Sequence, residues 1–186
     1  MQDFTIVFVH GTGGHDADWF PNIAKELEKR KVTFRIPKLP DQKPIQAKDW
    51  LSGVHKVVKE IKNPIVFVGY SLGTRAILLY LEKHKLRATH IILVAAFSNN
   101  IMNALRGGNK YPSFFQHRVN TDLIKQFVPN ITILHSKDDK IIPFSQAVEL
   151  SKELNAELRT FKEKGHFYEP EYFVDVLSVL EEKLGI

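Results

Sequence analysis

The sequence predicts an α/β fold in which a parallel sheet carries helices on both faces. Short runs rich in β-branched residues alternate along the chain with longer stretches whose apolar residues recur at helical spacing. Most of the short runs are apolar almost throughout, which is typical of parallel strands that are buried on both sides. Because crossovers between parallel strands are right-handed, this alternation builds a doubly wound, three-layer α/β architecture.

Six strands and six helices are expected in alternation. The strands are expected near residues 4–10, 32–36, 65–69, 90–94, 131–135 and 157–161. The helices are expected near residues 18–30, 47–62, 72–85, 122–127, 144–154 and 171–184. Residues 97–119 fit neither period, and we interpret them as a small lid-like excursion. No repeat or linker-like stretch interrupts the pattern, which predicts one domain over residues 1–186.

Composition narrows the functional classes. The net charge of +5 arises from 26 basic and 21 acidic residues that are interspersed, as in residues 25–31, so it indicates solvated helix faces and no nucleic-acid partner. The absence of cysteine excludes disulfides, thiolate catalysis and cysteine-ligated metals. The apolar run at residues 4–9 is too short for a signal or membrane segment, so we expect a cytoplasmic protein without a membrane partner.

The segment Gly69-Tyr70-Ser71-Leu72-Gly73 matches the pattern G-x-S-x-G and lies between a predicted strand and a predicted helix. In this context the serine occupies a strained turn that holds its hydroxyl clear of the sheet, and the glycines allow the two backbones to approach. A helix-capping serine is the simpler alternative. We interpret Ser71 as a nucleophile because a base and an acid follow it in the required order.

A serine hydroxyl needs a neighbouring base, and histidine suits that role near neutral pH. His166 is the expected base because it lies in a polar loop after the last predicted strand. His55 and His84 fall in helices, His90 begins a strand and His117 lies in the excursion, so each is expected to be a surface or packing residue. His135, at the end of a strand, is expected to be structural.

The acid that orients this base should lie at the carboxyl end of a strand, beside the histidine loop. Asp138 and Asp139 both follow the strand at 131–135, and we prefer Asp139. Asp138 is the alternative acid, with a turn-forming role as its simpler interpretation. The strand end at 95–100 offers no carboxylate.

Two backbone amides are expected to stabilise an oxyanion. One belongs to Leu72, at the start of the helix after the nucleophile, and the other to Thr12 in the glycine-rich loop after the first strand, with Gly13 as a substitute. That loop matches no nucleotide-binding pattern, and His10, His15 and Asp16 match no metal-binding spacing, so we expect neither a cofactor nor a metal.

With these motifs in order, the chain resembles the α/β-hydrolases over nearly its whole length. Within them it is similar to the small hydrolases of the retinoblastoma-binding protein nine family and their bacterial relatives. The similarity lies in Trp19-Phe20-Pro21, Glu26-Leu27, Pro37-Lys38-Leu39-Pro40, Trp50-Leu51 and Gly165-His166-Phe167. This resemblance implies a reduced six-stranded parallel sheet in the order 2-1-3-4-5-6. It also implies a Ser-Asp-His triad and little or no cap.

These observations predict a serine hydrolase, most simply a carboxylesterase, whose partner is a small acyl substrate. A shallow apolar acyl site is expected from the aromatics Tyr70, Phe97, Tyr111, Phe114, Phe115 and Phe167. A thioesterase or an amidase would use the same constellation. A non-catalytic binding protein on a hydrolase scaffold is the alternative from another class.

Overall fold

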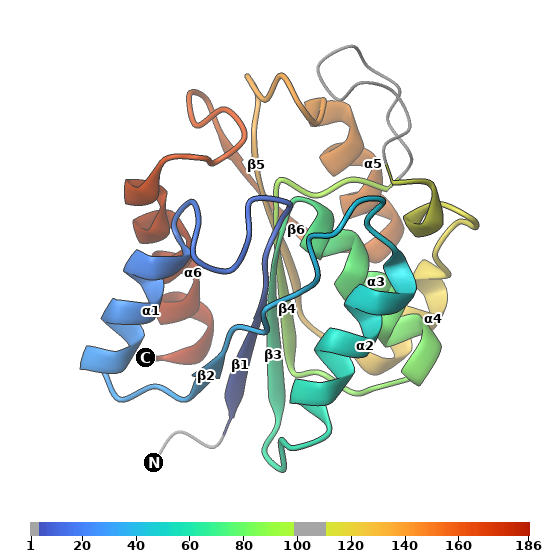
Figure 1. Cartoon of the computed structure of the whole chain (residues 1–186). Helices are drawn as coiled ribbons and strands as arrows, with labels where there is room; N and C mark the ends of the chain where they lie inside the picture. Colours follow the sequence, from blue (N-terminus) through green and yellow to red (C-terminus); the bar gives the residue numbers. More distant parts are fainter. Residues whose placement is uncertain (1–3, 99–110) are drawn as a thin grey trace.

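The computed structural model describes residues 4–98 and 111–186, and the middle layer of this part of the chain is one six-stranded sheet (Figure 1). In chain order its strands are β1 (Thr5–Val9), β2 (Phe34–Arg35), β3 (Ile65–Tyr70), β4 (His90–Val94), β5 (Ile131–Ser136) and β6 (Glu157–Phe161). Every neighbouring pair is parallel, and the spatial order is β2-β1-β3-β4-β5-β6. The expected sheet and its order are therefore confirmed.

Helices cover both faces of the sheet, as Figure 1 shows. One face carries α1 (Phe20–Lys29) and α6 (Phe173–Leu184), and the other carries α2 (Ala47–Val58), α3 (Leu72–His84), α4 (Thr121–Phe127) and α5 (Phe144–Leu154). Successive side chains of a strand point to opposite faces, so Val66 and Val68 join the core under α1 and α6 while Ile65 and Phe67 join the other core. The expected three layers are thus present.

Strand β2 is shorter than the sequence predicts. The pattern predicted residues 32–36, whereas only Phe34 and Arg35 pair with β1. The backbone N–H of Val32 donates instead to the carbonyl of Leu27 at the end of α1. The proline at position 37 has no N–H to extend the ladder. Helix capping and a proline therefore limit this edge strand from both ends.

The predicted excursion at 97–119 lies partly outside the described residues, which exclude 99–110. On its described side, a short helix η1 (Pro112–Phe114) follows Tyr111. The buried guanidinium of Arg75 on α3 donates to the carbonyls of Ser98, Phe114 and His117, and so ties both flanks of the excursion to the helix that follows the elbow. Burial lowers the pKa of Arg75 to about 10, which leaves it protonated at neutral pH.

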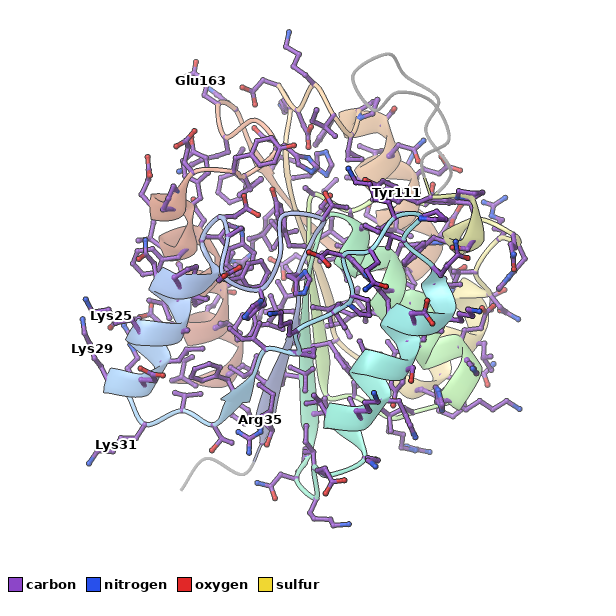
Figure 2. All side chains as sticks on the ribbon, viewed as in Figure 1. Lys25, Lys29, Lys31, Arg35, Tyr111 and Glu163 are labelled. Carbon is purple, nitrogen blue, oxygen red and sulfur yellow. The ribbon has the colours of Figure 1, made fainter. Side chains whose placement is uncertain are left out.

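Basic side chains are spread over the outside of the molecule. Figure 2 shows Lys25 and Lys29 extending outward from α1, and all three of Lys25, Lys29 and Lys31 are exposed. Acidic neighbours interrupt this surface, as where Glu26 pairs with Lys29 and with Arg30. In the described part of the chain, no helix combines the length and the apolar character needed to cross a membrane.

Candidate active site

The strained serine lies between β3 and α3, at the carboxyl edge of the sheet. Ser71 has φ 51° and ψ −120°, in the sparsely populated region that a nucleophile elbow requires. A Cβ at position 73 would lie 2.0 Å from the carbonyl oxygen of Val9, and one at position 69 would lie 3.0 Å from the Cα and 3.1 Å from the backbone N of Thr74. Only glycine therefore allows β1, β3 and α3 to approach closely enough to form this turn.

Ser71, His166 and Asp139 form a continuous hydrogen-bonded chain. The Ser71 hydroxyl donates to Nε2 of His166 over 2.9 Å, and Nδ1 of His166 donates to Oδ2 of Asp139 over 2.8 Å. His166 and Asp139 are 5% and 7% exposed, whereas Ser71 is half-buried. The imidazole of His166 is therefore shielded from bulk water, while the Ser71 hydroxyl remains reachable from the cleft.

The two neighbouring aspartates at the end of β5 have separate partners. The Oδ1 atom of Asp139 accepts from the backbone N–H groups of Ile141 and Ile142 at 2.8 and 2.9 Å, which leaves Oδ2 for His166. Asp138 is exposed and does not contact the imidazole. Its Oδ1 accepts from the Ser136 hydroxyl at 2.5 Å and from the Gly165 N–H at 2.9 Å, and the Ser136 hydrogen bond lowers the pKa of Asp138.

The loop that carries His166 is fixed by its neighbours. The hydroxyl of Tyr70 donates to the His166 carbonyl over 2.8 Å. Gly165 and Phe167 both have positive φ, and the ring of Phe167 is fully buried against Phe161. Burial raises the pKa of Tyr70, with Asp18 as a secondary cause, so Tyr70 remains a neutral donor. The imidazole is thus held from its backbone as well as from its ring.

The two expected oxyanion donors border the same cleft as Ser71. Leu72 is the first residue of α3, where an N–H group has no acceptor within the helix, and Thr12 lies on the loop after β1. His10 holds that loop, because its Nδ1 donates to the Gly11 carbonyl and its Nε2 accepts from the Leu39 N–H. Burial lowers the pKa of His10, which favours the neutral ring that this arrangement needs.

Metal binding is the alternative role for the region around His10. Both ring nitrogens of His10 already have partners within the protein. In the described part of the chain, no group of three or more His, Asp or Glu side chains is arranged to hold a metal ion.

The cleft over Ser71 has a volume of about 270 Å³, and its lining is more polar than the sequence predicts. Its described lining consists of Thr12, Gly13, Asp18, Tyr70, Ser71, Leu72, Tyr111, Ile141, His166 and Tyr168. Of the six aromatics expected there, Tyr70 and Tyr111 are present. The expectation is wrong for Phe97, Phe114 and Phe167, which are core residues with 1% or less of their surface exposed. Phe115 stacks on Phe97 and on the Arg75 guanidinium.

Sequence reasoning missed Asp18 and Tyr168. It placed Asp18 at the start of a helix, but α1 begins at Phe20 with Trp19 as its N-cap, and no side chain caps the helix. Asp18 instead has φ 53°, and its carboxyl group lines the cleft. Tyr168 lies two residues after His166, with its ring 5.0 Å from the imidazole. The available signals were a glycine-rich loop before Asp18 and the proximity of Tyr168 to the histidine.

A parallel sheet in this order, a nucleophile elbow and a histidine loop after the last strand define an α/β-hydrolase fold. The family model for serine hydrolases matches residues 6–176. The chain therefore belongs to the serine hydrolase family.

Curated relatives agree with this assignment. The chain is 28% identical to Putative hydrolase YdeN of Bacillus subtilis (strain 168), over 95% of this chain and 92% of that protein. It is also 28% identical to Serine hydrolase RBBP9 of Rattus norvegicus, over 96% of this chain and 94% of that protein. The expected resemblance to the retinoblastoma-binding protein nine family and its bacterial relatives is thus confirmed.

Solved structures show the same fold. The crystal structure of the ydeN gene product from B. subtilis has a TM-score of 0.83 and 26% identity, and the match covers 96% of this chain and 99% of that chain. Est1E from Butyrivibrio proteoclasticus has a TM-score of 0.75 at 18% identity, covering 98% of this chain and 87% of that one. At that identity the second likeness concerns the fold alone.

Proposed function

We propose that this serine hydrolase is a carboxylesterase that cleaves small esters through an acyl-enzyme on Ser71. The observation that carries the proposal is the hydrogen-bonded chain from the Ser71 hydroxyl through His166 to Asp139, which opens into a small cleft. In this proposal His166 is the general base, Asp139 orients and stabilises the imidazolium, and the amides of Leu72 and Thr12 bind the oxyanion.

The acylation step conserves every proton. The Ser71 hydroxyl passes its proton to Nε2 of His166 while its oxygen forms a bond to the ester carbonyl carbon. When the tetrahedral intermediate collapses, the bond between that carbon and the alcohol oxygen breaks. The proton on Nε2 moves to the leaving alcohol, and the acyl group stays on Ser71.

Deacylation repeats these steps with water as the nucleophile. His166 takes a proton from water as the hydroxide oxygen attacks the acyl carbon, and the bond to the Ser71 oxygen breaks. The proton then returns to Ser71, and the carboxylic acid leaves.

The size of the cleft supports small substrates. A volume of about 270 Å³ lies near the lower end of the usual range for small-molecule pockets, roughly 300 to 1,000 Å³, and is far too small for a triglyceride. Thioesters and amides present the same carbonyl to the same groups, so only an assay with each class of substrate distinguishes the leaving group.

Hydrolysis of p-nitrophenyl esters from acetate to octanoate tests the proposal. The wild type should turn over the short esters, and a fluorophosphonate probe should label it. The Ser71→Ala variant should not be labelled, and its kcat should fall by about 10⁴-fold or more. The optimum should lie at short acyl chains.

Three results would count against the proposal. A wild type that neither labels nor turns over any ester, thioester or amide indicates a non-catalytic protein on a hydrolase scaffold. Turnover that survives in Ser71→Ala removes the nucleophile from the proposal. A rate that increases steadily up to octanoate contradicts the small cleft.

A further inference from the structure

The lining of the cleft next to Ser71 includes a carboxyl group to which no described residue donates a hydrogen bond. Asp18 borders the cleft together with Ser71 and His166, and its Oδ2 lies over the loop after β1, 3.1 Å from where a Cβ on Gly13 would be. Among the described residues, none donates a hydrogen bond to Asp18 or forms an ion pair with it. The pKa of Asp18 is raised by burial and, to a smaller extent, lowered by the charge of His166. This carboxylate is therefore available to a ligand.

The usual structural role of such an aspartate is absent. An aspartate just before a helix commonly caps the first N–H groups, but α1 begins two residues later without a side-chain cap. Asp18 also has a positive φ, which is uncommon for residues other than glycine, and it belongs to the lining of the cleft, with its Oδ2 close to Gly13. Local folding therefore does not explain the position of this carboxyl group.

Holding this carboxyl group in the cleft has an energetic cost. Burial raises the pKa of Asp18 to about 6, because the partly dehydrated carboxylate lacks the hydrogen bonds that would replace its water. At neutral pH the group is still mostly ionised. An uncompensated charge of this kind in a cleft is a common feature of ligand-binding positions.

The surroundings of Asp18 favour a positively charged ligand. The described lining of the cleft contains no lysine and no arginine, although the chain as a whole has a net charge of +5. The rings of Tyr111 and Tyr168 provide aromatic surface, and Tyr168 is 52% exposed. A carboxylate beside aromatic faces is a typical arrangement for binding an ammonium group.

We propose that Asp18 is a specificity-determining residue that binds an ammonium group of the substrate close to the scissile carbonyl. This inference rests on the proposed esterase function and names its substrate class: small esters that carry a protonated or quaternary amine. The same carboxylate disfavours substrates with a carboxylate or phosphate near the ester. Acyl-coenzyme A, which the overall positive charge would attract, is therefore a poor fit for this cleft.

Two pairs of isosteric esters test the proposal from both sides of the scissile bond. Acetylcholine and 3,3-dimethylbutyl acetate differ in the charge on the alcohol side, and alanine ethyl ester and ethyl isobutyrate differ in the charge on the acyl side. For each pair the ratio of kcat/KM, charged over neutral, is measured with the wild type and with Asp18→Asn. Asparagine suits this test because it tolerates positive φ and removes only the charge.

In at least one pair the wild type should prefer the charged ester by about 10- to 100-fold, the range expected for a charge-assisted hydrogen bond from a primary ammonium or for a desolvated cation–π contact of a quaternary one. In Asp18→Asn this ratio should fall to about one tenth of the wild-type value or less. Asp16→Asn, on the same loop but outside the described lining of the cleft, is the matched control and should keep the wild-type ratio. The pair that responds identifies the side of the ester that Asp18 faces.

Two other outcomes are distinguishable from each other. If the wild type hydrolyses the esters but both ratios are equal in wild type and Asp18→Asn, the inference about Asp18 is wrong and the esterase function stands. If the wild type hydrolyses none of them, the p-nitrophenyl ester series decides separately whether the proposed function stands, and calorimetric binding of each pair to Ser71→Ala decides the question for Asp18. Equal affinity for charged and neutral members overturns the inference, and tighter binding of the charged member supports it.

Discussion

The floor of the cleft (Ser71, His166 and Asp139) and its wall (Asp18 and Tyr168) differ in how their polar groups are bonded. On the floor, Ser71, His166 and Asp139 are joined by hydrogen bonds of 2.8 to 2.9 Å, and the histidine and the aspartate are almost fully buried. On the wall, Asp18 has no hydrogen-bond partner among the described residues, and Tyr168 is half exposed. The floor is therefore complete without a ligand, whereas the wall carries a carboxylate to which no described residue donates a hydrogen bond.

In the proposed mechanism, this difference separates the residues that carry out the reaction from the residue that selects the substrate. Groups that move protons need fixed geometry, which the protein supplies through its own hydrogen bonds. Groups that choose a substrate must leave their polar atoms available until the substrate arrives. We therefore expect substitutions on the floor to remove activity and substitutions on the wall to change its preference.

The largest expected effect distinguishes the two aspartates that end β5. Asp139→Asn should lower kcat by about 10³- to 10⁴-fold, because an amide cannot hold the imidazole in the tautomer that accepts the serine proton. Asp138→Asn should lose less than about tenfold, since its remaining oxygen still accepts from the Gly165 amide. Steady-state hydrolysis of p-nitrophenyl acetate measures both. Equal small losses in the two variants would sink the assignment of Asp139.

An intermediate effect is expected for Tyr70, whose hydroxyl holds the backbone of His166. Tyr70→Phe removes the hydroxyl that donates to the His166 carbonyl and leaves that buried oxygen unpaired, a cost of about 1 to 3 kcal/mol. We expect kcat to fall by about tenfold with little change in KM, because the histidine shifts while the walls that bind substrate remain. An increase in KM at constant kcat would indicate instead that Tyr70 acts through substrate binding.

The smallest expected effect is a gain in thermal stability, and it concerns Asp18 on the wall. The pKa of Asp18 is raised to about 6 in the folded chain, so the folded state binds a proton more tightly than the unfolded state. The carboxylate therefore destabilises the fold above pH 6, and this cost disappears as the pH falls through 6 towards 4. Asp18→Asn should raise the melting temperature by about 1 to 3 °C at pH 8 and leave it unchanged at pH 4.

Thermal melts of wild type, Asp18→Asn and Asp16→Asn over this pH range provide the measurement. Asp16 is exposed on the same loop, so its substitution should not alter the pH dependence. A lower melting temperature for Asp18→Asn at pH 8 would mean that the carboxylate has a stabilising partner, which contradicts the contrast between floor and wall.

Much of the fold was predictable because its signals are local. The strands of a doubly covered parallel sheet are continuous apolar runs, and the buried strand His90–Val94 begins and ends where the pattern predicts. Strand β2 was not predictable at this precision, since its limits depend on a hydrogen bond from Val32 to helix α1. The limits of an edge strand depend on tertiary contacts as much as on the intrinsic β-propensity of its residues.

The candidate site divides in the same way. Ser71 and His166 were predicted from a motif and from chain order, which reflect the geometry of the fold itself. The wall residues were not, because a left-handed residue at position 18 cannot be recognised from the polar residues around it. The aromatics near the excursion were assigned to the cleft by composition, and Phe97 and Phe114 instead fill the core. Burial of a side chain depends on packing that spacing alone does not specify.

Trapping the acyl-enzyme is the most direct test of the central claim, that the floor of the cleft activates Ser71 as a nucleophile. The wild type is mixed with p-nitrophenyl acetate, quenched in acid within the first turnovers, and analysed by intact mass and peptide mapping. The account predicts one added acetyl group on the peptide that contains Ser71, and none in Ser71→Ala. Turnover without any acyl group on Ser71, or with the group on another residue, would contradict it.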